Sequence, residues 1–259
     1  MKITLYSDLH SEFRRKEPWY PKLSQYKNAK YTEVLVLAGD IGVGNQAIKY
    51  VKGMSERYPD LPIIYVAGNH DYYKTDLLKM LPKFRVAFAD CPNVHFLEND
   101  IIEIDDVVFI GSTLWAGFNF IEMNLIIEQS VSRSISDFHR IRVGDAKLTC
   151  QDMIKRHYES VIFINNSLIK FKDRKTVVIT HFIPMPWQHR GIAFDNVSYY
   201  FQNDLKEIIE RNGPLVWMYG HTHDNRDEMV HSTRIISNQR GYPGEYMITP
   251  FQEDLIIEV

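Results

Sequence analysis

The sequence is poor in cysteine: its 259 residues include only Cys91 and Cys150. These two residues are far apart, and neither belongs to a Cys-x-x-Cys pair. Nothing in this spacing indicates a disulfide framework or a zinc knuckle. We therefore expect the protein to work in a reducing compartment.

The sequence also lacks a long apolar run. No uninterrupted stretch approaches the roughly 18 to 20 apolar residues that are needed to cross a membrane. Residues 1–6 lead directly into a β-like run whose end carries chemically active side chains, which leaves no room for a cleavable signal. We expect a soluble, cytoplasmic protein that has no membrane partner.

Charge of one sign is not in large excess, because 30 Lys and Arg residues face 33 Asp and Glu residues, for a formal charge of -3. Nonspecific binding of nucleic acid requires clustered cations that neutralise phosphates, so nucleic acid is not the expected partner. The short basic runs at residues 14–16 and 170–175 are interpreted as solvated faces. A hydrophobic fraction of 45%, with 15 Tyr and 14 Phe, predicts a folded protein with a large core.

Short apolar runs bounded by Gly, Asp, Asn or Pro predict buried strands at residues 3–6, 34–38, 63–67, 107–110, 177–180 and 215–219. Helices are predicted at residues 45–58 and 75–88, and this β-then-α order favours a largely parallel sheet. Closely spaced later runs indicate antiparallel additions and a second sheet; they lie at residues 101–104, 107–110, 234–237, 246–249 and 255–259.

The resulting fold prediction is an α/β protein with one domain over residues 1–259. It is a layered α/β/β/α sandwich, in which two mixed β-sheets are flanked by helices. Residues 117–171 form a mainly helical insertion, in which Thr149 and Asp152 have the spacing of a capping box. Two interpretations of this insertion stay open: helices packed on the sheet, or a lid or cap over the site.

Five of the six strands predicted first end in residues of metal-binding type. The blocks are Asp8-Leu9-His10, Gly39-Asp40, Gly68-Asn69-His70-Asp71, His181 and Gly220-His221-Thr222-His223. Ligands bind at the carboxyl ends of parallel strands, so these blocks can meet in one crevice. In extended backbone, residues two apart point to the same side, which makes Asp8 with His10, and likewise His221 with His223, a chelating pair.

Taken together and in this order, the five blocks resemble the signature of the calcineurin-like metallophosphoesterases, which bind two metal ions. The resemblance implies that one metal is held by Asp8, His10, Asp40 and His223. It implies that the other is held by Asp40, Asn69, His181 and His221, so that Asp40 bridges the two. Imidazole and carboxylate ligands suit Mn, Fe, Zn, Ni or Co better than Ca²⁺.

The resemblance also implies a reaction, the hydrolysis of a phosphoester by a hydroxide that bridges the two metals. In the family, the histidine that corresponds to His70 is the general acid, which donates a proton to the leaving oxygen. Asp71 is interpreted as the residue that orients His70; the alternative is that Asp71 caps the following helix.

Residues after Asp40 narrow the subclass. The sequence Ile41-Gly42-Val43-Gly44 lacks the Asp-Arg-Gly of protein Ser/Thr phosphatases, and Val43 stands where purple acid phosphatases carry an iron-binding tyrosine. We expect a phosphodiesterase or phosphatase that acts on a small or nucleotide-like phosphoester, with the diester preferred. The alternatives are a nuclease and a noncatalytic binding scaffold of the same fold.

Five of the ten histidines lie outside the blocks. His189 and Arg190 follow the His181 strand, in a loop that either contacts substrate or is an ordinary surface loop. The histidines that match no block are interpreted as structural or surface residues; they are His95, His139, His157 and His231.

Overall fold

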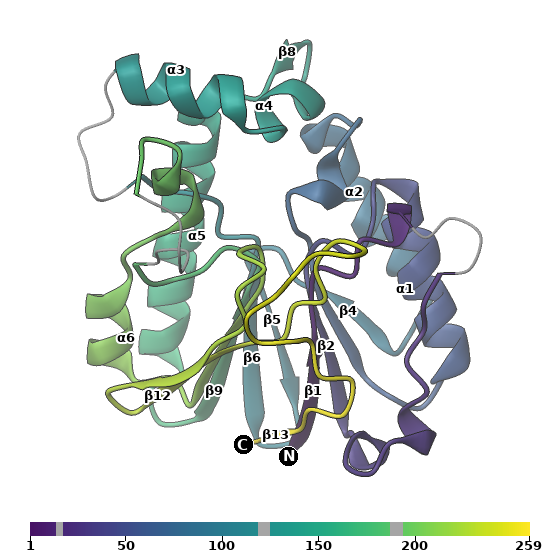
Figure 1. Cartoon of the computed structure of the whole chain (residues 1–259). Coiled ribbons are helices and arrows are strands. Elements are labelled where there is room, and N and C mark those ends of the chain that lie inside the picture. Colours follow the sequence, from purple (N-terminus) through teal and green to yellow (C-terminus); the bar gives the residue numbers. More distant parts are fainter. Residues whose placement is uncertain (14–17, 119–124, 187–193) are drawn as a thin grey trace.

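Two β-sheets packed face to face form the centre of the protein, and helices cover their outer faces (Figure 1). The computed structural model describes residues 1–13, 18–118, 125–186 and 194–259. This arrangement confirms the predicted sandwich of two mixed sheets flanked by helices.

The first sheet has the strand order β13-β1-β2-β3-β4. Its strands are, in that order, Ile257–Glu258, Lys2–Tyr6, Val34–Ala38, Ile63–Val66 and Val94–Phe96. Strands β1 to β4 are parallel to one another, and only β13 runs antiparallel at the edge. The parallel strands therefore all end on the same side of the sheet.

The second sheet has the order β11-β12-β10-β9-β6-β5. Its strands are, in that order, Asp227–Val230, Thr233–Ser237, Val216–Tyr219, Lys175–Thr180, Val107–Ser112 and Asp100–Ile104. The four central strands are parallel, and the two edge strands are antiparallel to their neighbours. Both sheets thus place a row of parallel carboxyl ends at one end of the sandwich.

Each central strand is buried on both faces, which explains why the sequence shows continuous apolar runs rather than alternation. In β2, Val34 and Val36 belong to the core between the two sheets, whereas Leu35 and Leu37 belong to the core under the helices. Both cores are closed to solvent along this strand, because all four side chains are fully buried.

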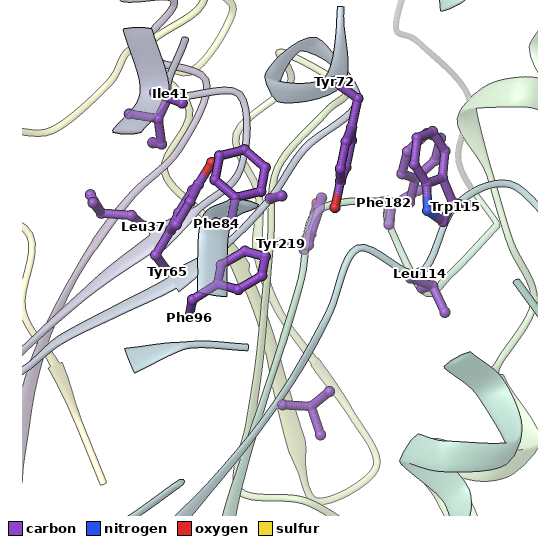
Figure 2. Close-up of a cluster of buried hydrophobic side chains, with 14 of the residues drawn as sticks. Leu37, Ile41, Tyr65, Tyr72, Phe84, Phe96, Leu114, Trp115, Phe182 and Tyr219 are labelled. Atoms are coloured by element: carbon purple, nitrogen blue, oxygen red, sulfur yellow. The ribbon is translucent and has the colours of Figure 1, made fainter. Parts of the chain in front are cut away.

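Helices α1 (Asn45–Arg57) and α2 (Leu77–Phe88) cover the first sheet, and α5 (Cys150–Lys170) and α6 (Lys206–Asn212) cover the second (Figure 1). Figure 2 shows the aromatic layer under α2, where the ring of Phe84 lies 5.7 Å from Tyr65 and 5.1 Å from Phe96. Edge-on and tilted ring contacts of this kind add to the stabilisation from burial and fix α2 on the sheet.

The predicted insertion contains two kinds of element. Helix α5 packs on the second sheet, and its predicted capping box is confirmed: Thr149 Oγ1 accepts from the backbone N–H of Asp152, and the Asp152 carboxylate accepts from that of Thr149. The shorter elements α3 (Leu125–Ser134), α4 (Asp137–Arg140), β7 (Arg142–Val143) and β8 (Ala146–Lys147) lie in the upper part of Figure 1, beyond the carboxyl ends of the strands.

One predicted strand is wrong, at residues 246–249, which form a loop with bends. Tyr246 is 89% exposed and Ile248 is 46% exposed, so these apolar side chains do not mark a buried face. Strands β4 and β11 and helix α6 were not predicted. Within the described residues, no helix combines the length and apolarity that a membrane span requires.

Candidate metal centre

The seven predicted metal ligands meet at the carboxyl ends of the parallel strands. Four come from the first sheet and three from the second: Asp8 and His10 after β1, Asp40 after β2, Asn69 after β3, His181 after β9, and His221 and His223 after β10. Six of the seven are buried, and only His223 reaches partly toward solvent. The site therefore lies at the seam between the two sheets.

Five of these residues share an uncommon backbone conformation. Asp8, His10, Asp40, His221 and His223 all have positive φ, between 45° and 75°. The extended chelating pairs that the sequence suggested are thus replaced by left-handed turns. Such a conformation costs roughly 1–2 kcal/mol for a residue that carries a Cβ, and strain of this kind gathers at functional sites.

One half of the site is formed by two histidine rings that face each other. His10 Nε2 lies 3.1 Å from His223 Nε2, and Asp8 Oδ1 lies 3.3 Å from the same His223 atom. The Nδ1 atoms turn the other way, toward Glu12 at 3.1 Å and Glu245 at 2.7 Å. Carboxylates accept hydrogen bonds only, so each Nδ1 carries a proton and each Nε2 is left to bind a cation.

A proton and a metal ion compete for this position. Burial lowers the pKa of His223, but its hydrogen bonds to Asp8 and Glu245 prevail and raise that pKa to about 9. Burial likewise works against ionisation of Asp8, yet the hydrogen bond from His223 holds the pKa of Asp8 below its ordinary value. The surroundings therefore favour positive charge at the point where the rings meet.

The other half of the site contains His181, His221 and Asn69. His181 Nδ1–H donates to the backbone oxygen of Ala38 at 3.0 Å, which leaves a lone pair on Nε2. That lone pair lies 2.9 Å from Asn69 Oδ1, which is also an acceptor. Burial lowers the pKa of His181 to about 4, so no proton stands between the two acceptors near neutral pH. A cation fits this arrangement.

The ring of His221 gives a second indication. Its Nε2 atom is buried and has no hydrogen-bond partner among the described residues. Burial also lowers the pKa of this histidine well below the ordinary value, so the ring is neutral. A buried ring nitrogen without a partner is costly, and a metal ion bound to that nitrogen would remove the cost.

Asp40 lies between the two halves. Its Oδ1 is 3.4 Å from His181 Nε2, and its Oδ2 is 4.0 Å from His10 Nε2. Burial, together with the negative charges of Asp8 and Asp71, raises the pKa of Asp40. Bound cations would stabilise the ionised carboxylate and so offset this effect. Gly68 leaves room for this carboxylate, since a Cβ at that position would lie 2.2 Å from Asp40 Oδ1.

His70 stands beside the site on the wall of a cavity. Its Nε2 lies 3.9 Å from Asp40 Oδ2 and 3.3 Å from the Tyr242 hydroxyl, while its Nδ1 lies 3.2 Å from Glu12 Oε1. The ring of Tyr73 stacks on His70 with a centroid distance of 4.1 Å. The imidazole is thus fixed on one face and at both nitrogens.

Asp71 has a different role from either one that the sequence suggested. Its carboxylate accepts hydrogen bonds from the backbone N–H groups of Asp40, Ile41, Gly42 and Gly68 at 2.7–3.1 Å. Among the described contacts, Glu12 is the carboxylate that hydrogen-bonds the His70 ring, and Asp76 is the residue that caps α2. Asp71 therefore fixes the loops after β2 and β3 and does not orient the imidazole.

Several residues of the site carry no motif in the sequence, among them Glu12, Tyr242 and Glu245. Glu12 follows His10 by two positions, so an Asp-x-His-x-Glu pattern could have indicated it. Tyr242 and Glu245 lie in a loop that is far from every block, and no local signal marks them. Their contacts to His70 and His223 appear only in the folded chain.

The cavity above the site has a volume of about 610 Å³. Its walls come from the end of α3 and from α4, from residues 195–201, and from the loop of Tyr242 and Glu245. Five aromatic side chains line it: Phe13, Tyr73, Tyr200, Phe201 and Tyr242. Arg140 is the one Lys or Arg among the lining residues that the structure describes.

The described histidines that match none of the five blocks do not belong to the metal centre. His157 is buried and donates to the backbone oxygen of Leu114 at 3.1 Å, and His231 pairs with Glu210 at the surface. His139 is exposed, and His95 is half-buried. His189 and Arg190 lie outside the described residues.

The fold and the site define a metal-dependent phosphoester hydrolase. The chain belongs to the calcineurin-like phosphoesterase family, whose sequence model matches residues 1–225. An uncharacterized protein of Acanthamoeba polyphaga mimivirus is 31% identical over 238 residues, which are 82% of this chain and 79% of the viral protein.

Several solved structures share the fold, among them two in which most of both chains is covered. Phosphopantetheinyl hydrolase from Mycobacterium tuberculosis has a TM-score of 0.72 at 16% identity, with 93% of this chain and 90% of that chain covered. A dimetal phosphatase from Danio rerio has a TM-score of 0.51 at 12% identity, with 91% of this chain and 86% of that chain covered. Identities this low show the likeness of the fold and nothing finer.

Proposed function

We propose that this chain hydrolyses a phosphodiester or phosphomonoester of a small or nucleotide-like molecule, with the diester preferred, at a centre of two divalent metal ions. The observation that carries the proposal is the pair of facing acceptors on one side of Asp40, His181 Nε2 and Asn69 Oδ1, which lie 2.9 Å apart. Two acceptors at such a distance repel unless a cation lies between them. On the other side, the Nε2 atoms of His10 and His223 converge at 3.1 Å, where a proton or a metal ion can bind.

The assignment of ligands follows these two halves. One ion would be held by Asp8, His10, Asp40 and His223, and the other by Asp40, Asn69, His181 and His221. Mixed imidazole and oxygen ligands suit Mn, Fe, Zn, Ni or Co. When bound, a pair of such ions supplies positive charge for the phosphate and lowers the pKa of a water molecule, which becomes the nucleophile.

His70 is assigned the role of general acid. In the doubly protonated ring, which is the acid form, Nδ1–H donates to Glu12 and Nε2–H points toward Tyr242 and the cavity. As the phosphorus–oxygen bond of the substrate breaks, this Nε2 proton passes to the leaving oxygen, which departs as a neutral alcohol. The stacked ring of Tyr73 keeps the imidazole in place during the transfer.

The cavity supports a small organic substrate. Its volume of about 610 Å³ lies within the range of roughly 300–1,000 Å³ that is typical of small-molecule sites. Aromatic walls such as Phe201 and Tyr242 offer apolar faces for the organic part of the ester. Arg140 is exposed on the same wall and can pair with a second anionic group of the substrate.

The test is hydrolysis of one aryl phosphomonoester and one aryl phosphodiester, first after chelation and then after separate addition of Mn²⁺, Ni²⁺, Zn²⁺ or Mg²⁺. We expect chelation to abolish cleavage and at least one metal to restore it, with the diester cleaved faster. Absence of cleavage with every metal would refute the proposal. A phosphopantetheinyl ester completes the panel, because a protein of the same fold carries that substrate in its name.

A further inference from the structure

Asp137 is a buried carboxylate that connects the helical insertion with the metal centre. It is the first residue of α4 and is fully buried. One of its oxygens accepts from Asn69 Nδ2 at 2.8 Å and from the Tyr73 hydroxyl at 2.8 Å. The other accepts from the Tyr200 hydroxyl at 2.6 Å. Three separate segments of the chain therefore meet at one side chain.

The bond to Asn69 decides which atom of that amide faces the metal site. An ionised carboxylate accepts hydrogen bonds and cannot donate them, so the NH₂ group of Asn69 must turn toward Asp137. The amide oxygen then points the other way, where it lies 2.9 Å from His181 Nε2. An amide turned by half a rotation would present N–H groups to the cation and could not bind it.

Burial of this carboxylate carries a cost. The carboxylate is fully removed from water, and the hydrogen bonds from Tyr200, Asn69 and Tyr73 offset that cost. No ion pair with Lys or Arg supports Asp137 among the described residues. A buried charge held by three donors indicates that this position needs a pure acceptor rather than an apolar side chain.

We propose that Asp137 is a positioning residue for Asn69, and that through this bond the segment of α3 and α4 helps to form the metal centre that it covers. This inference rests on the proposed function only in taking Asn69 as a metal ligand. It follows that the insertion orients a ligand in addition to forming a wall of the cavity.

The experiment is a double-mutant cycle with Asp137→Ala, Asn69→Ala and the double variant of the full chain. The measured quantity is Zn²⁺ affinity, obtained by competition with a chromogenic chelator, so no activity is needed. We expect Asp137→Ala to weaken the binding of one of the two Zn²⁺ ions by about 10- to 100-fold. Losses of this size are usual when a residue that orients a metal ligand is removed. When Asn69 is already replaced by Ala, Asp137→Ala should lower the Zn²⁺ affinity by less than about twofold.

Two further variants separate positioning from general stability. Tyr200→Phe removes one donor to Asp137 but keeps the bond to Asn69, so it should lose much less Zn²⁺ affinity than Asp137→Ala. Asp137→Asn keeps one acceptor oxygen at a nearly unchanged size and should recover most of the affinity that Asp137→Ala loses. Thermal unfolding of each metal-free variant reports any loss of folding.

Two results would overturn the inference. The first is wild-type Zn²⁺ affinity in Asp137→Ala. The second is an equal loss of Zn²⁺ affinity on Asp137→Ala whether residue 69 is Asn or Ala. A general structural defect would lower the affinity by the same factor in both cases, because it does not act through Asn69. A wild-type protein that binds two Zn²⁺ ions yet hydrolyses no phosphoester would refute the proposed function and would leave this measurement valid.

Discussion

Replacement of Gly68 by alanine would place a methyl group against Asp40, the proposed bridging ligand. A Cβ on Gly68 would lie 2.2 Å from Asp40 Oδ1 and 2.4 Å from the Asp40 backbone nitrogen. Real Cβ atoms essentially never approach a neighbour closer than 3.0 Å. The carboxylate oxygen must therefore move by at least about 0.8 Å, and the backbone at Asp40 must shift with it.

The expected loss follows from that displacement. A misplacement of about 1 Å at a catalytic group costs on the order of 100-fold in rate, so Gly68→Ala should lower turnover of an aryl phosphodiester by about this factor. Because Asp40 is assigned to both ions, the variant should also bind fewer than two metal ions per chain. Metal content by mass spectrometry and steady-state kinetics measure the two effects.

A matched control is Gly144→Ala. A Cβ at Gly144 meets nothing within 4 Å, and this glycine has a φ of +63°, so the variant carries backbone strain without crowding the site. We expect Gly144→Ala to melt at a lower temperature and to keep both ions. If Gly68→Ala keeps two ions and wild-type turnover, then the close approach of Gly68 does not matter and the bridging role of Asp40 is refuted.

Three further changes give distinct results. His70→Ala should lower turnover by about 100-fold or more while metal content holds, and unchanged turnover would remove His70 from the mechanism. Arg140→Ala should raise KM by about tenfold for a phosphoester with a second anionic group but not for an aryl ester; equal effects on both substrates would contradict that contact. Burial lowers the pKa of His157 from 6.5 to about 4, so the stability that depends on its neutral form is present above pH 6.5 and is lost as the pH falls toward 4. Between pH 6.5 and 4 this loss amounts to about 3 kcal/mol of the free energy of unfolding. In denaturant titrations at a series of pH values, His157→Gln should therefore lose less stability over this range than the wild type. An identical pH dependence in the two proteins would refute the role given to His157.

The fold could be predicted largely because its central strands are buried on both faces. The run that ends at Ala38 is apolar throughout and then changes at once to Gly39 and Asp40. Such a change marks both the end of a strand and the position of a functional side chain. Segments that are mostly exposed show no such change in the sequence. Strand β11 was therefore not predicted, and residues 246–249 were wrongly predicted as a strand.

The partners of the site residues were beyond prediction for a different reason. Asp71 follows His70 directly in sequence, which suggested a bond between them. The chain turns through η4 (His70–Tyr72) at this point, so the carboxylate points to backbone amides instead. Glu245 and Asp137 reach the site from distant segments, and contacts of that kind depend on tertiary packing that no local pattern records.

The position of the site at the seam between the sheets makes each bound ion a cross-link. Under the proposed assignment, each ion takes ligands from both sheets: Asp8, His10 and Asp40 with His223 for one, and Asp40 and Asn69 with His181 and His221 for the other. Occupancy is then linked to folding, and free metal at 100 times its dissociation constant would add about 2.7 kcal/mol per site to the free energy of unfolding. The cofactor that serves the chemistry would thus also set how firmly the two halves of the sandwich hold together.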